Sequence, residues 1–135
     1  MKNSKVLKAI LVVAGLVASV IGSSIVTMPE TFYATNGIEL AGNVSLLNEI
    51  RAAGAALLAM GLFIISGAFV SRLTFTSTLV AALLYLSYGL SRILSMAIDG
   101  LPAEGLLQVV ILEVVIGLVC VFALAGYRLD RKEYA

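Results

Sequence analysis

The sequence predicts an all-α fold, an integral membrane four-helix bundle whose N-terminus and C-terminus both lie in the cytoplasm. Of the 135 residues, 61% are hydrophobic and 13% are charged, and the mean hydropathy is +1.08. A soluble domain carries about 25% charged residues, so lipid is the expected solvent for most of these side chains. Four apolar stretches are long enough to cross a bilayer, and the basic residues outside them gather on one side.

Each predicted span is a continuous apolar stretch bounded by charged or turn-forming residues. About 20 helical residues cross the roughly 30 Å hydrocarbon core of a bilayer, and all four stretches reach that length. The first ends at Pro29, which cannot continue a helix. We expect residues 29–44 to cap the outer end of the bundle as a short interfacial helix. The chain then forms one membrane domain, residues 1–135, with spans over residues 6–28, 46–70, 75–98 and 106–127.

The lysines and arginines at the ends of the spans predict the orientation, because cytoplasmic segments carry an excess of these residues. The N-terminal tail, the second connection and the C-terminal tail hold seven of them, whereas the first and third connections hold none. The seven are Lys2, Lys5, Lys8, Arg72, Arg128, Arg131 and Lys132. The short connections after the second and third spans predict antiparallel neighbouring helices.

The composition argues against several classes of function. The sequence has no histidine and a single cysteine, Cys120, so zinc, haem and iron–sulfur sites lack their usual ligands, and we expect no cofactor. The net charge of +1 gives no reason to expect a nucleic-acid partner. The motifs of serine hydrolases and nucleotide-binding enzymes are also missing. An enzymatic function is therefore the weakest hypothesis.

Small residues on the first two spans predict where helices approach each other, because membrane helices associate through close packing. They recur at helical spacing along one side of each span. They are Gly15, Ser19, Gly22 and Ser23 in the first span, and Ala52, Ala56 and Ala59 in the second. We expect both stripes to be packing faces.

Four ionisable residues lie inside the predicted spans, roughly 5–10 Å from the outer helix ends at 1.5 Å per residue. They are Glu49, Arg51, Arg92 and Glu113. A charge at mid-membrane costs about 2.5–3.5 kcal/mol, so we expect these charges to meet inside the bundle. Arg92 is predicted to pair with Glu113 or Glu49. Arg51 is predicted either to join them or to reach the lipid headgroups.

One face of the third span carries the strongly polar side chains of its outer half, and such a face is expected to turn away from lipid. On this face the hydroxyls of Tyr85 and Tyr88 are predicted to be secondary partners of the charges. The predicted polar cluster therefore has nine members: Asn48, Glu49, Arg51, Tyr85, Tyr88, Arg92, Ser95, Asp99 and Glu113.

Two interpretations of this polar cluster stay open. In the first, the cluster lines a pocket that opens to the outer face and binds a small amphipathic or anionic ligand, such as a lipid or quinone headgroup. In the second, the charges form a closed network in a structural or assembly subunit, which has a membrane-protein partner or a second copy of itself. A path through the membrane is less favoured, because the inner half carries only hydroxyl groups.

Several segments together resemble a family of small bacterial membrane proteins known as a domain of unknown function. They are Asn48-Glu49-Ile50-Arg51-Ala52, residues 33–40, residues 92–102 and Leu112-Glu113. The layout is similar to the broader DoxX-like group of four-helix membrane proteins. The resemblance covers roughly residues 6–127 and implies a multi-pass protein of the bacterial cytoplasmic (inner) membrane. Some DoxX-like relatives are linked to quinone or sulfur redox chemistry, whereas this chain has one cysteine and no cofactor ligands.

Overall fold

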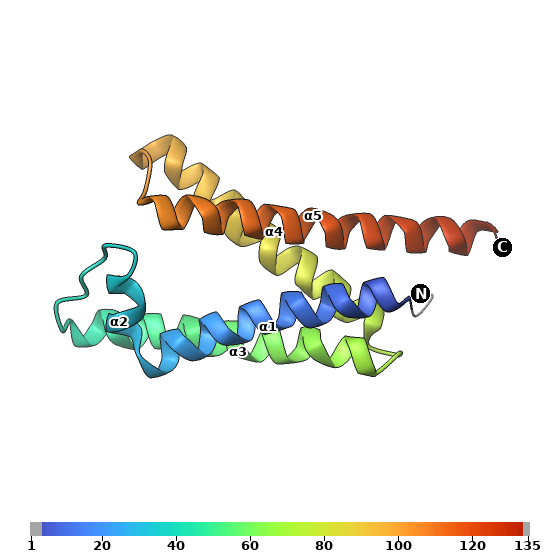
Figure 1. Cartoon of the computed structure of the whole chain (residues 1–135), viewed down its shortest axis with the longest axis horizontal. Helices are drawn as coiled ribbons and strands as arrows, with labels where there is room; N and C mark the ends of the chain where they lie inside the picture. The colour runs from blue at the N-terminus through green and yellow to red at the C-terminus, as the bar shows by residue number, and fades with distance from the viewer. Residues whose placement is uncertain (1–3, 134–135) are drawn as a thin grey trace.

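The computed structural model describes residues 4–133, with side chains described as far as residue 126 (Figure 1). All five helices are α-helices: α1 Lys5–Thr27, α2 Pro29–Ala34, α3 Val44–Phe69, α4 Thr74–Asp99 and α5 Glu104–Glu133. The four longer helices are long and apolar enough to cross a membrane. The all-α class and the four potential spans are therefore confirmed. Their ends agree with the predicted spans within two residues, except that α5 continues to Glu133.

Local sequence signals set most of the helix ends. Ser4 caps α1, since its hydroxyl accepts the Leu7 N–H at 3.1 Å, and Asn43 caps α3 in the same way. Pro29 opens α2 at a position where a helix needs no N–H. Gly100 ends α4 with a φ of 98°, a conformation that favours glycine.

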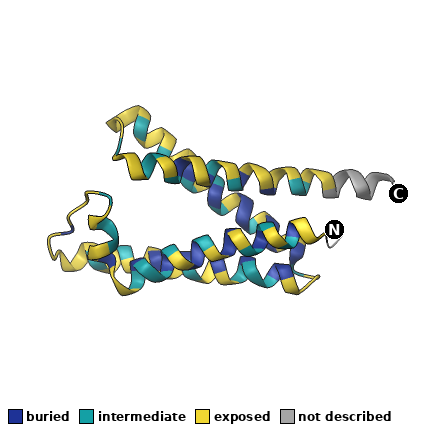
Figure 2. Ribbon diagram, in the orientation of Figure 1, coloured by how far each residue is buried: buried dark blue, intermediate teal, exposed yellow. Residues whose placement is uncertain are grey.

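The helices form two pairs, α1 with α3 and α4 with α5, and α4 connects the pairs (Figure 1). The first turns of α4 lie beside α3, and α4 then runs away from it, so its last turns stand apart from α1 (Figure 1). Buried residues follow the facing sides of α1, α3 and α4 (Figure 2). Large apolar side chains such as Leu83 and Phe122 are exposed, as expected of helices whose outer sides meet lipid.

Glycines bring α1 and α3 into backbone contact. A Cβ on Gly22 would lie 2.7 Å from the Gly54 carbonyl oxygen, and one on Gly61 would lie 2.8 Å from the Gly15 carbonyl oxygen. Ser19 packs against Gly61 between these two contacts. Only residues without a Cβ permit such a close approach.

The predicted packing face is right for α1 and wrong for α3. Gly15, Ser19 and Gly22 are buried, whereas the alanines expected to pack on α3 are exposed. Those alanines are Ala52, Ala56 and Ala59. The buried side of α3 instead carries Gly54 and Gly61, two turns apart. The glycine face is favoured because it lets the two backbones come closer than an alanine face does.

Hydroxyl groups on α4 attach this helix to the α1–α3 pair. Thr74 Oγ1 donates to the Gly67 carbonyl at 2.9 Å, and Ser77 Oγ donates to the Phe63 carbonyl at 3.0 Å. Farther along α4, the Tyr85 hydroxyl donates to the Ala14 carbonyl on α1. Lipid offers no hydrogen bonds. These three hydroxyls therefore donate to backbone oxygens of α1 or α3.

The contact between α1 and α3 predicts that Gly22→Ala destabilises the bundle. The added Cβ meets the α3 backbone, so we expect a loss of about 1–3 kcal/mol in the free energy of unfolding. Reversible unfolding in mixed detergent micelles measures this loss. The matched control is Gly126→Ala on α5, where nothing lies within 4 Å of the new Cβ. Equal effects of the two substitutions would contradict the proposed tight contact.

Candidate functional site

An ion pair joins α4 and α5 in the part of the bundle near α2. Arg92 Nε donates to Glu113 Oε2 at 3.0 Å, and the side chain of Glu113 is only 10% exposed, against 34% for Arg92. Gly89, one turn before Arg92, allows the approach, since a Cβ there would lie 2.8 Å from Val114 on α5. Of the two partners predicted for Arg92, Glu113 and Glu49, the structure pairs it with Glu113.

The hydroxyls of Tyr85 and Tyr88 were expected to be partners of the charges, and the structure gives the two side chains other contacts. The Tyr88 ring lies 5.9 Å from the guanidinium carbon of Arg92, within the range of a cation–π contact. Tyr88 thus contacts the Arg92 guanidinium with the face of its ring. The Tyr85 hydroxyl donates to Ala14 on α1, so its predicted bond to the charges is wrong. Its hydroxyl instead fixes α4 against α1.

The remaining five members of the predicted cluster lie outside this pair. Asn48 and Glu49 are exposed on α3, because the glycine face of α3 turns toward α1 and leaves them outside. Arg51 Nε donates to the Val26 carbonyl at 3.2 Å.

The last two members lie near the end of α4. Ser95 Oγ donates to Asp99 Oδ2 at 3.0 Å. Both residues are exposed in the last turns of α4, which stand apart from the α1–α3 pair (Figure 1). Because Glu49 is exposed on α3, the expected contact of Glu49 with Arg92 and Glu113 is wrong.

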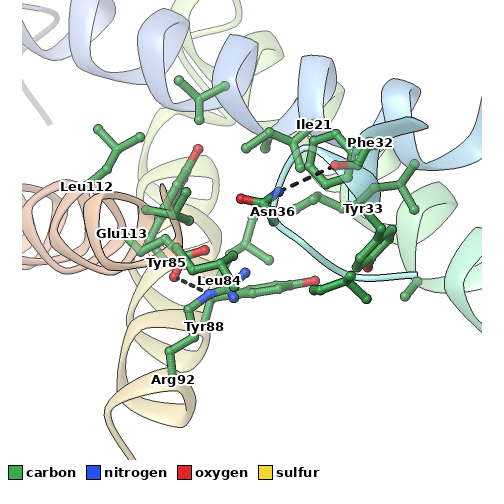
Figure 3. Close-up of a pocket in the computed structure, with 18 residues that line it drawn as sticks. Ile21, Phe32, Tyr33, Asn36, Leu84, Tyr85, Tyr88, Arg92, Leu112 and Glu113 are labelled. Carbon is green, nitrogen blue, oxygen red and sulfur yellow. Dashed lines mark hydrogen bonds and ion pairs between the residues drawn. The ribbon is translucent and has the colours of Figure 1, made fainter. Parts of the chain in front are cut away.

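A cavity of about 190 Å³ lies beside the ion pair (Figure 3). All five helices and the connection after α2 contribute to its wall. The lining side chains that carry polar atoms are Tyr33, Asn36, Tyr85, Tyr88, Arg92 and Glu113. The rest of the wall is apolar, with Ile21 from α1 and Leu112 from α5 among the labelled residues (Figure 3). The four predicted cluster members that the structure brings together are thus all at this cavity.

The segment from α2 to the following connection forms a wall that the site prediction missed. Phe32 and Tyr33 line the cavity and contact each other edge to face, with ring centroids 5.5 Å apart. Asn36 Nδ2 donates to the Phe32 carbonyl at 3.4 Å. A Cβ on Gly105 would lie 3.3 Å from Asn36 Oδ1, so this connection reaches the first turn of α5. Two sequence signals pointed to this segment, the expected cap over residues 29–44 and the family resemblance of residues 33–40.

The lining combines hydrogen-bond donors with an apolar surface. Arg92 uses Nε for Glu113, and a guanidinium has further N–H donors on its two terminal nitrogens. Among the described lining residues, Arg92 and Glu113 are the charged ones, so the wall has no net charge when both are ionised. Within residues 4–126, no serine, threonine or cysteine lines the cavity. A guest with an oxygen acceptor and an apolar body fits this arrangement.

The family is identified by comparison with known sequences. Residues 6–124 match the model of a family described as a domain of unknown function, DUF4345. The chain belongs to this family. No curated protein and no solved structure matches the chain. The match includes every residue of the DUF4345 chain that lines the cavity.

Proposed function

We propose that this DUF4345 protein binds a small amphipathic molecule in the cavity beside Arg92 and Glu113. The observation that carries the proposal is the cavity of about 190 Å³ next to a hydrogen-bonded ion pair in an otherwise apolar wall. An apolar cavity of about 150 Å³ already accepts a molecule the size of benzene. The polar end of the guest lies against the ion pair, and its apolar part lies against α1 and α5.

The chemistry of the wall favours a headgroup without net charge. Glu113 already balances the charge of Arg92, and Arg51, which an anionic headgroup would need as a second cation, bonds to the Val26 carbonyl instead. A carbonyl or hydroxyl oxygen accepts from the free guanidinium N–H groups without placing a second negative charge near Glu113. A quinone carbonyl and a glycerol ester both provide such an oxygen.

A structural or assembly role is the second candidate, supported by one observation. Arg92 and Glu113 contact each other directly and so connect α4 to α5 without any guest. A closed network would need no cavity beside it, and this is why ligand binding is the first candidate. A membrane-embedded enzyme is the weaker candidate, because none of the described lining residues is a serine, threonine or cysteine.

Ligand retention tests the binding proposal. The variant Val109→Phe places a larger side chain into the cavity from α5, whereas Ile111→Phe changes an exposed side chain on the same helix that does not line the cavity. In native mass spectrometry of protein extracted from its own membrane, we expect a bound small molecule on the wild type and on Ile111→Phe, and its loss from Val109→Phe. Equal occupancy of all three proteins, or no bound molecule on any, would contradict the proposal.

We also propose an orientation and a location. Both termini lie in the cytoplasm, neighbouring spans are antiparallel, and the cavity is near the outer face of a bacterial cytoplasmic membrane. The distribution of lysine and arginine supports this topology. A distant relationship to the DoxX-like group is supported by the four-helix layout alone.

Cysteine labelling in intact cells tests the orientation. Cys120→Ser removes the native thiol, and Thr35→Cys or Ser71→Cys then adds one at an exposed position of the first or second connection. A maleimide that cannot cross membranes is expected to label Thr35→Cys in intact cells and Ser71→Cys only after lysis. The reverse pattern would show that the bundle is inverted.

A further inference from the structure

A second hollow lies between α1 and α5, farther from α2. It has a volume of about 380 Å³ and is lined by apolar side chains from both helices. They include Val6, Ile10 and Val13 from α1, and Val115, Ile116 and Val119 from α5. Each of its described lining residues has an apolar side chain. Only hydrocarbon fits such a surface without losing hydrogen bonds.

The second hollow follows the cavity along the same two helices. On α1, Val13 lines the second hollow, and Val17, one turn later, lines the cavity. On α5, Val115 lines the hollow and Leu112 lines the cavity. The two spaces thus follow each other along the same pair of helices, and together they are called the α1–α5 seam. The seam exists because α1 packs mainly against α3, and α5 packs mainly against α4.

The dimensions and chemistry of the seam suit one long hydrocarbon chain. From Ile21 to Val6 it spans fifteen residues of α1, or about 22 Å at 1.5 Å per residue. One leaflet of hydrocarbon is about 15 Å thick, half of the whole core, so the seam is longer than one leaflet and long enough for a lipid chain. Its one polar end is the wall with Arg92 and Glu113.

We propose that the molecule bound in the cavity is an uncharged amphiphile with a single long chain, and that the chain lies in the α1–α5 seam. This inference rests on the proposed binding function and adds the class of ligand and the direction of its tail. The head occupies the cavity near Arg92, and the tail passes Val17 and then Val13.

Tryptophan fluorescence tests the path of the tail, because the sequence contains no tryptophan. Phe32→Trp reports on the cavity and replaces one aromatic wall residue by another, and Val13→Trp reports on the second hollow, where Val13 is 55% exposed. Val20→Trp is the matched control, an exposed valine of the same helix that lines neither space. Each variant is placed in dioleoylphosphatidylcholine vesicles, and monostearoylglycerol is added with bromine, a quencher, near the head or near the end of its chain.

The proposal predicts saturable loss of fluorescence that excess unbrominated monostearoylglycerol reverses. Phe32→Trp is quenched by bromine near the head, and Val13→Trp by bromine near the chain end. Val20→Trp loses fluorescence only in proportion to the amount of probe. Saturable quenching of Phe32→Trp, with Val13→Trp behaving like Val20→Trp, would overturn the tail path and leave the binding function intact. Proportional quenching of all three variants, the result for ordinary lipid only, would overturn both.

Discussion

The ion pair between Arg92 and Glu113 is the interaction on which the polar part of this bundle depends. A single charge inside a membrane helix is costly, and two opposite charges that share a hydrogen bond lower that cost together. The pair forms because Gly89 lets α5 approach α4 at the level of Glu113. It also joins the two helices at the site where α4 leaves the α1–α3 pair, so the wall of the cavity keeps its shape.

The cavity follows from the unequal packing of the four long helices. Glycines hold α1 and α3 in backbone contact over several turns, and the α4–α5 pair has its own close contacts at Gly89 and Gly117. Each helix therefore has one preferred neighbour, and α1 and α5 are left with a seam between them. The Tyr85 hydroxyl joins the two pairs at Ala14. The α2 segment then covers the side of the cavity that the long helices leave open.

The sequence predicts the four long helices well because length and hydropathy depend on the chain alone. It also limits the partner of Arg92 to Glu113 or Glu49, because a buried charge has few choices. It fails for Glu49 and the alanines near it, since a span that is apolar on nearly every side does not reveal which side meets a neighbour. The wall with Asn36 could not be predicted either, because the path of the connection over residues 35–43 depends on the helices that it joins.

The most direct measurement is a double-mutant cycle on the ion pair. Arg92→Gln, Glu113→Gln and the double variant are unfolded reversibly in mixed micelles, and the free energies of unfolding are compared with that of the wild type. If the two side chains are paired inside the bundle, each single variant leaves one group without its partner, and the coupling energy is about 1–2 kcal/mol. Effects that add to within about 0.5 kcal/mol would show that Arg92 and Glu113 do not interact, and the site would lose its basis.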